Sequence, residues 1–199
     1  MLVGSVPHQR LLSKVSCHGI RGKVLSWIGN WLKDRKQRVG INGQFSEWRE
    51  MNSGVPQRSV LGPVLFNIFI NDLEKGVNSE VAKFADDTKL LKIIKSQADC
   101  KELQKDLSKL GDWVTKWQMK FNVDKCKIMH IGKHDPNYTY KMMESKLVVT
   151  TQEKDLGVIV DSSLKISTQC AVAAKKANKM LGIIKKGIDN KTENITLPL

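Results

Sequence analysis

The sequence predicts an α+β fold, because apolar residues recur at helical spacing in some segments and gather in short strand-like runs in others. Helical spacing is found around residues 11–19, 24–32, 63–73, 98–120 and 166–184. Short runs bounded by turn residues occupy 37–50, 81–94, 127–132 and 156–161. With 199 residues, 41% of them hydrophobic, the chain is long enough to bury a core.

The N-terminal third predicts two helices and a hairpin. The first helix is expected to end near Gly19, and the second carries Trp27 and Trp31, which we expect to pack rather than to stack on bases. Residues 37–50 predict a β-hairpin whose turn is Asn42-Gly43, because these two residues readily accept the positive φ angles of a tight turn.

The middle of the chain predicts a buried helix over 63–73, with Ser59 as a possible cap and Pro63 near its first turn. Two short apolar runs then flank Asp86-Asp87, which places these two residues at a hairpin tip. The segment 98–120 predicts a long amphipathic helix.

A strong positive charge predicts a polyanionic partner. The formal net charge is +13, and clustered Lys and Arg attract nucleic-acid phosphates. Between residues 165 and 188 there are six lysines and no Asp or Glu, so this helix could follow a phosphate backbone. For both features a solvated basic surface is the alternative.

The remaining composition excludes several classes of protein. The four cysteines are widely spaced and form no Cys-x-x-Cys pair, which argues against zinc and favours reduced, mostly buried thiols. No signal peptide precedes Pro7, and the apolar run 60–70 is too short to span a bilayer. We therefore expect no membrane association and an intracellular protein, cytoplasmic or nuclear.

Asp86 and Asp87 are the candidate site for chemistry. Two adjacent carboxylates repel each other, and a divalent cation removes that cost. Hard oxygen ligands suit Mg²⁺ or Mn²⁺. Taken alone the pair is a weak signal, because Asp-Asp is also ordinary turn chemistry.

The segment Phe84–Asp87 (Phe-Ala-Asp-Asp) resembles the aromatic-Ala-Asp-Asp signature of reverse transcriptases of non-long-terminal-repeat retrotransposons, of the jockey or LINE-like kind. Other segments resemble further parts of that family in the same order, so that the likeness spans roughly residues 6 to 188. Val6–His8 resembles the residues that follow the family's first catalytic strand. Residues 53–63 and 66–73 resemble the loop that contacts the nucleotide and template, with the helix that follows it. Residues 122–126 resemble the segment near the triphosphate, and Leu156–Val158 resembles the hairpin that grips the primer.

The resemblance implies a partial right-hand polymerase palm, an antiparallel sheet with helices on one face, over residues 1–150. A primer-grip and thumb-like segment with the C-terminal tail would follow over 151–199. The implied activity is that of an RNA-directed DNA polymerase, which transfers nucleotides by a two-metal mechanism. The implied partners are an RNA template, a DNA primer and dNTPs.

The same resemblance implies roles for individual residues. Asp86 and Asp87 would bind the metal ions, and Lys125 would neutralise or protonate the leaving pyrophosphate. The residues expected beside the nucleotide or template are Gly54, Pro56, Gln57, Arg58 and Phe84. Two alternatives stay open: Lys125 as a surface lysine and Gln57 as an amide that stabilises its own loop.

Two departures from the family pattern lead us to expect little or no polymerase activity from this chain alone. The family's first catalytic strand carries an Asp shortly before the Val-Pro-His segment, whereas the first acidic residue here is Asp34. The family's Pro-Gln-Gly loop reads Pro-Gln-Arg, with Arg58 in place of glycine. A non-catalytic nucleic-acid-binding remnant of a mobile element is the alternative function, and a relic without a role is a third. We also expect a loosely packed or poorly soluble chain.

Overall fold

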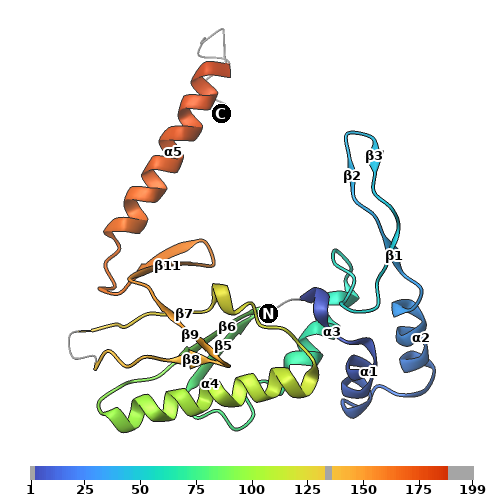
Figure 1. The fold of residues 1–199 in the computed structure, drawn as a ribbon. Coiled ribbons are helices and arrows are strands. Elements are labelled where there is room, and N and C mark those ends of the chain that lie inside the picture. The colour runs from blue at the N-terminus through green and yellow to red at the C-terminus, as the bar shows by residue number, and fades with distance from the viewer. Residues whose placement is uncertain (1–2, 133–135, 188–199) are drawn as a thin grey trace. The chain divides into compact units, whose positions relative to one another are not determined.

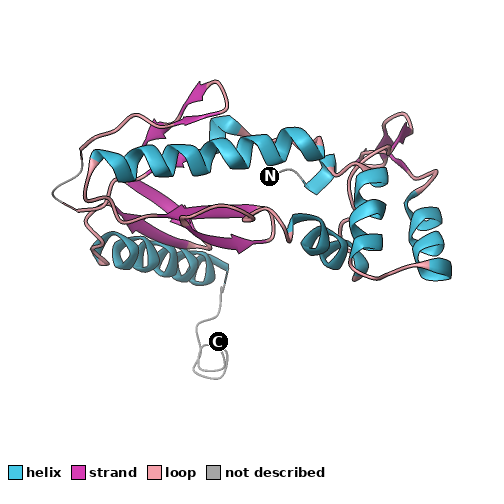
Figure 2. Ribbon diagram, turned by 90° about the horizontal axis from the view of Figure 1, so that it is seen from below, coloured by secondary structure: helices cyan, strands magenta, loops and turns pink. Residues whose placement is uncertain are grey.

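The computed structural model describes residues 3–132 and 136–187 and confirms the α+β class (Figures 1 and 2). The chain divides into two compact units, each treated by itself below. The first unit comprises Met1–Lys127 with Pro136–Val148, and the second comprises Ile128–Asp135 with Val149–Leu199.

The first unit holds four α-helices and four small hairpin ladders. Its helices are α1 (His8–Cys17), α2 (Gly22–Leu32), α3 (Leu61–Ile70) and α4 (Gln97–Trp117), with 3-10 turns η1 (Val3–Ser5) and η2 (Val123–Lys125). Its antiparallel strand pairs are β1 (Lys36–Gln37) with β4 (Arg49–Glu50), β2 (Gly40–Ile41) with β3 (Gln44–Phe45), β5 (Glu80–Phe84) with β6 (Asp87–Leu91), and β8 (Lys141–Met142) with β9 (Ser145–Lys146).

A continuous hydrophobic core joins the helices of the first unit. It brings together the apolar faces of α1, α2 and α3, and part of α4. Its buried members are Val6, Leu11, Val15, Ile28, Leu32, Val55, Leu65, Phe66, Phe69, Ile70, Val114 and Met119. The spacing of these residues at three and four positions along each helix explains why the segments fold as helices: one stripe of each is removed from water.

A buried lysine lies at the edge of this core. The Lys14 ammonium lies over the rings of Phe69, Trp113 and Trp117, at 4.8, 4.5 and 3.9 Å from their centroids, and forms an ion pair with Asp72. Burial lowers the pKa of Lys14, partly offset by the hydrogen bond to Asp72. The arrangement joins α1, α3 and α4 through one charged group.

The second unit contains β11 (Gln152–Asp155), β12 (Val158–Asp161) and α5 (Ser167–Gly187), with β7 (Lys127–Ile128) and β10 (Val148–Val149) at the unit boundary. β11 and β12 pair antiparallel from Gln152↔Asp161 to Asp155↔Val158. The Ile159 amide donates to the Gln169 side chain at 2.9 Å, which attaches α5 to β12. No described residue of α5 is buried.

Most elements expected from the sequence are confirmed, with shifted boundaries. The Asn42-Gly43 turn has φ angles of 49° and 80°, as its hairpin requires. α3 ends at Ile70 rather than at residue 73, and Ser59 accepts the Gly62 amide at 3.0 Å from one residue before the N-cap. The run 127–132 forms a strand only over Lys127–Ile128.

Two expectations differ more strongly. The described strands form two-stranded sheets rather than one palm-like sheet, and most of the strands are only two residues long. The thiols are not mostly buried, since Cys17 and Cys170 are exposed and only Cys100 is fully buried.

Among the described helices none combines the length and apolarity that crossing a bilayer requires.

Candidate functional site

The paired aspartates lie at the tip of the β5–β6 hairpin, where the sequence predicted them. The strands pair from Glu80↔Leu91 to Phe84↔Asp87, which leaves Ala85 and Asp86 as the turn. Ala85 has a φ of 50°, so the turn is tight. Asp86 is half-buried, and Asp87 and Phe84 are exposed. The hairpin therefore presents two carboxylates at its solvent-accessible end.

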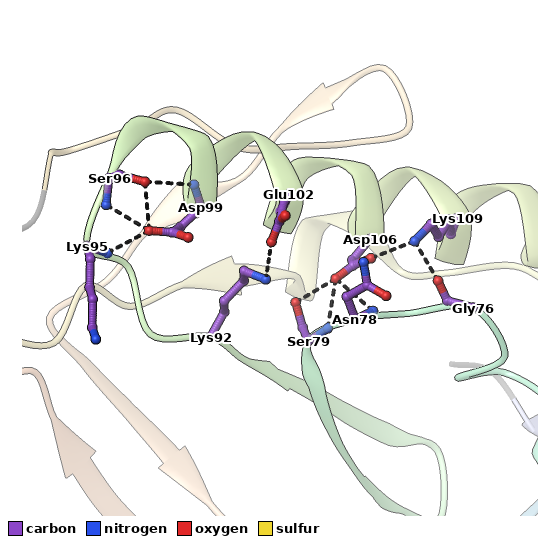
Figure 3. A network of polar contacts seen from close by, with 10 residues as sticks. All are labelled: Gly76, Asn78, Ser79, Lys92, Lys95, Ser96, Asp99, Glu102, Asp106 and Lys109. Carbon is purple, nitrogen blue, oxygen red and sulfur yellow. Dashed lines mark hydrogen bonds and ion pairs between the residues drawn. The ribbon is translucent and has the colours of Figure 1, made fainter.

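The incoming end of this hairpin is anchored to α4 by a buried carboxylate (Figure 3). Asp106 is fully buried and accepts hydrogen bonds from the amides of Asn78 and Ser79, at 3.1 and 2.8 Å, and from the Ser79 hydroxyl at 2.7 Å. Lys109 donates to its other oxygen at 2.9 Å. Burial acts to raise the pKa of Asp106, but the bonds from Ser79 and Lys109 prevail and lower it to about 2.

The outgoing end of the hairpin is attached to the same helix. Lys92 directly follows β6 and pairs with Glu102 at 2.7 Å. Ser96 and Asp99 form a capping box that starts α4, and the Asp99 carboxylate also accepts the Lys95 amide at 2.9 Å. These bonds lower the pKa of Asp99. Both ends of the hairpin are thus fixed to the first three turns of α4 (Figure 3).

Gly54, the first of the predicted nucleotide-loop residues, is buried against the N-terminal segment. Its amide donates to the Val6 carbonyl at 2.7 Å, and His8 Nε2 lies 2.9 Å from its carbonyl oxygen. Its φ is 87°, and a Cβ there would lie 2.9 Å from the Cα of Gly4. Glycine is therefore required at position 54 by conformation and by close approach.

The rest of the loop is held by Ser59. Its hydroxyl donates to the Pro56 carbonyl at 2.7 Å and accepts the Gly62 amide, so the loop is tied to the first turn of α3. A Cβ on Gly62 would lie 2.3 Å from the Pro56 oxygen. Gln57 and Arg58 at the outside of the loop are exposed, and Arg58 has a φ of 59°.

Lys125 lies on a third element. It is exposed and ends the turn η2, where its amide donates to the Asn122 carbonyl at 3.1 Å. The predicted site residues thus occupy three elements of the first unit: the β5–β6 tip, the loop before α3 and η2. Within residues 3–132 and 136–187, no group of three or more His, Cys, Asp and Glu side chains is placed to hold a metal ion.

Two positioning residues were not predicted from the sequence. Asp106 interrupts the apolar stripe of α4 between Leu103 and Leu110, and Lys14 does the same in α1 between Leu11 and Val15. An ionisable residue on the buried face of a helix requires a partner, so the sequence pattern indicated that Asp106 and Lys14 have partners. It did not indicate which residues these are, because Ser79 and Asp72 are distant in sequence.

Comparison with known proteins assigns the chain to a family. Residues 4–184 match the family model described as reverse transcriptase (RNA-dependent DNA polymerase). The chain is 29% identical over 150 residues to the RNA-directed DNA polymerase from mobile element jockey of Drosophila melanogaster, covering 70% of this chain and 16% of that protein. It is 33% identical over 166 residues to the probable RNA-directed DNA polymerase from transposon BS of the same species, covering 77% and 17%.

A third relative, the jockey polymerase of Drosophila funebris, is 31% identical over 152 residues, covering 71% of this chain and 17% of the relative. The chain thus spans about a sixth of the length of the curated relatives it matches. The match to the family model nevertheless includes the aspartate hairpin, the Gly54 loop and η2. The chain therefore belongs to the reverse transcriptase family, as a domain of the kind found in non-long-terminal-repeat mobile elements.

Proposed function

We propose that this chain is part of the palm of an RNA-directed DNA polymerase and that Asp86 and Asp87 are its metal-binding residues. The observation that carries the proposal is the acidic hairpin tip, anchored at both ends to α4, in a chain of this family. Reverse transcriptases generally use divalent metal ions. Two carboxylates are sufficient protein ligands for Mg²⁺ when substrate phosphates and water supply the others.

The hairpin has the donor set for such an ion. Asp86 and Asp87 offer hard oxygen ligands, and in the next position of β6 the buried Thr88 hydroxyl has no hydrogen-bond partner among the described residues. When bound, the metal ions would activate the primer hydroxyl and stabilise the leaving group. The contribution of the chain is to hold two negative charges together at a fixed place, which the anchors at Ser79 and Lys92 support.

The other predicted site residues would serve the nucleotide and the template. Exposed Gln57 and Arg58 and the rigid backbone around Gly54 and Pro56 would contact the nucleotide or template, beside Phe84 of the hairpin. Lys125, also exposed, would neutralise the pyrophosphate. We further propose an RNA template, a DNA primer and dNTPs as partners, a palm over residues 1–150 followed by a primer-grip and thumb-like segment over 151–199, and a cytoplasmic or nuclear location. Residues 188–199 of that segment lie outside the described part of the chain.

Metal binding tests the proposal directly. Titration of the chain with Mn²⁺, followed by the decrease of the free-ion electron paramagnetic resonance signal, should show binding that Asp86→Asn and Asp87→Asn each weaken about tenfold or more. Glu80→Gln is the matched control, because Glu80 is an exposed acid at the opposite end of the same hairpin. Equal binding by all four proteins would refute the assignment of the metal site.

A nucleic-acid-binding remnant without catalysis is the second candidate. It is favoured by Arg58, which has a left-handed backbone and replaces the family's glycine. Primer extension on an RNA template with Mg²⁺ or Mn²⁺ separates the two. We expect little or no extension by the 199-residue chain, because Arg58 occupies the loop that we propose contacts the nucleotide. Robust incorporation that Asp86→Ala abolishes would exclude the remnant.

A further inference from the structure

The segment Arg35–Arg49, here called the aromatic hairpin, projects from the end of α2 (Figure 1). It contains β2 and β3, and every residue from 36 to 50 is exposed. Four of its side chains are large and apolar, yet between 58% and 67% of each is accessible to solvent: Val39, Ile41, Phe45 and Trp48. Folding of the described chain does not explain why a small ribbon keeps such residues in water.

The Arg38 guanidinium lies over two of these rings. Its guanidinium carbon lies 3.9 Å from the centroid of Phe45 and 4.6 Å from that of Trp48. No carboxylate among the described residues forms an ion pair with Arg38. Stacking on both rings restricts the guanidinium while its positive charge stays available to an anion.

The position of Phe45 is fixed by the strand opposite. Gly40 pairs with Phe45 across the ladder, and a Cβ on Gly40 would lie 2.8 Å from the edge of the ring. The ring therefore lies directly on the glycine backbone. Beyond this pair, Val39 and Ser46 exchange hydrogen bonds at 2.8 and 2.9 Å. The aromatic surface is thus arranged before any partner arrives, which reduces the entropic cost of binding.

The charge of the aromatic hairpin selects the partner. Between residues 35 and 49 there are four basic residues and one acidic residue, Glu47. The basic ones are Arg35, Lys36, Arg38 and Arg49. Exposed rings interleaved with cations are the arrangement that binds single-stranded nucleic acid, because bases stack on the rings while cations contact the phosphates. A duplex would offer phosphates but few accessible base faces.

We propose that the aromatic hairpin binds single-stranded nucleic acid, with bases stacked on Trp48 and Phe45 and with Arg38 contacting a phosphate. The proposal deepens the proposed function by assigning an unpaired strand, such as template outside the primed duplex, to a surface of the first unit. It does not require Asp86 or Asp87 to bind metal, so the two assignments can fail independently.

Fluorescence anisotropy with a labelled oligouridylate, measured on the 199-residue chain in EDTA, tests the proposal. Trp48→Ala and Phe45→Ala should each weaken binding about tenfold, the size expected when one base can no longer stack. Trp48→Phe should retain most of the affinity. Arg38→Gln should lower the slope of log K against log salt by about 0.7, the value for one single-strand phosphate contact.

Three controls distinguish this surface from general stickiness. Trp27→Ala removes an aromatic ring of equal exposure from α2 and should leave the affinity unchanged. Measurement in EDTA keeps divalent ions away from Asp86 and Asp87, which separates this proposal from the metal site. Crosslinking to 4-thiouridine in the oligonucleotide should label peptides within residues 35–49. This experiment uses the unsubstituted chain, so it does not depend on the folding of any variant.

Several results would overturn the inference. One is unchanged affinity in both Trp48→Ala and Phe45→Ala with native circular dichroism. Another is crosslinking confined to residues outside 35–49. A third is sedimentation showing that the same two substitutions abolish self-association rather than oligonucleotide binding, which would make the surface a protein contact. Binding of a blunt duplex by the 199-residue chain that is as tight as binding of the oligouridylate, and is weakened equally by Trp48→Ala, would exclude a single-strand preference of this surface.

Discussion

At the scale of single residues, Arg58 has a backbone conformation that glycine adopts more readily. A φ of 59° places its Cβ near the following carbonyl oxygen, and the side chain is exposed without compensating contacts in the described residues. The resemblance described from the sequence implies glycine at this position. The replacement therefore leaves local strain in the loop that we propose contacts the nucleotide.

We expect Arg58→Gly to raise the free energy of unfolding by about 0.5–1 kcal/mol, because relief of the left-handed strain exceeds the added freedom of glycine in the unfolded chain. Urea denaturation of the two proteins measures this. Arg49→Gly is the control, since Arg49 lies in a strand and its replacement should destabilise the chain by about 0.5–1 kcal/mol. Destabilisation by both substitutions would show that Arg58 is not strained.

Lys14, unlike exposed Arg58, is a buried cation with partners: it pairs with Asp72 and lies over three aromatic rings. We expect Lys14→Met to lower the free energy of unfolding by about 2 kcal/mol, because it removes the cation from the three rings and leaves half-exposed Asp72 with Trp113 alone. Thermal unfolding compares it with Lys116→Met, where the lysine is exposed and 5.8 Å from the Trp117 centroid. Equal losses of stability in the two variants would mean that the Lys14–Asp72 ion pair and the three ring contacts add no stability of their own.

At the scale of secondary-structure elements, Asp106 makes the placement of the β5–β6 hairpin dependent on pH. Its pKa in the folded chain is about 2, below the value of 3.8 for an unperturbed aspartate. The folded state therefore binds its proton less tightly than the unfolded state does. The resulting stabilisation is complete above about pH 4 and disappears as the pH falls towards 2.

We expect Asp106→Asn to cost about 2–3 kcal/mol at neutral pH, because the buried amide cannot replace a carboxylate that accepts from Ser79 and Lys109. The difference between wild type and variant should shrink between pH 4 and pH 2 in urea denaturation. Hydrogen exchange should also show faster opening of β5 and β6 in the variant. A difference that is constant across this pH range would refute the role of the ionised form.

The elements could be predicted from the sequence where local signals are strong. Asn42-Gly43 specified its own turn, and the long stripe ending near Trp117 specified α4, because both signals lie within one element. The aspartate tip was predicted for the same reason. The anchors of that tip were not, because Ser79 and Asp106 meet only after α4 packs on the hairpin. The length of the strand expected over 127–132 was overestimated. β7 pairs with β10, which is only two residues long, so β7 is also limited to two residues.

At the scale of the whole molecule, α5 carries a row of exposed lysines. Lys175, Lys179 and Lys186 lie along one side of the helix at spacings of four and seven residues, and all are exposed. α5 contains no acidic residue, in contrast to α4, whose lysines alternate with Asp and Glu. The potential should therefore be more positive along α5 than along α4.

We expect the triple substitution of these lysines by glutamine to weaken binding of an RNA–DNA hybrid and to reduce its salt dependence by roughly 0.9 in slope for each phosphate that is no longer neutralised. The control replaces Lys101, Lys105 and Lys116 of α4, which removes the same charge from a helix rich in acids. Binding across a salt series measures both. Equal slopes for the two triple variants would mean that only net charge matters.

One helix connects the remote parts of the first unit. α4 contacts the β5–β6 hairpin through Asp106 and Glu102, and contacts β8 through Gln104. It contacts α1 through Lys14, whose ammonium lies over the Trp117 ring. Because these contacts attach the β5–β6 hairpin to α4 at both of its ends, we expect a displacement of α4 to move Asp86 and Asp87 with it. A substitution that shifts α4 would then alter the acidic tip without changing either carboxylate.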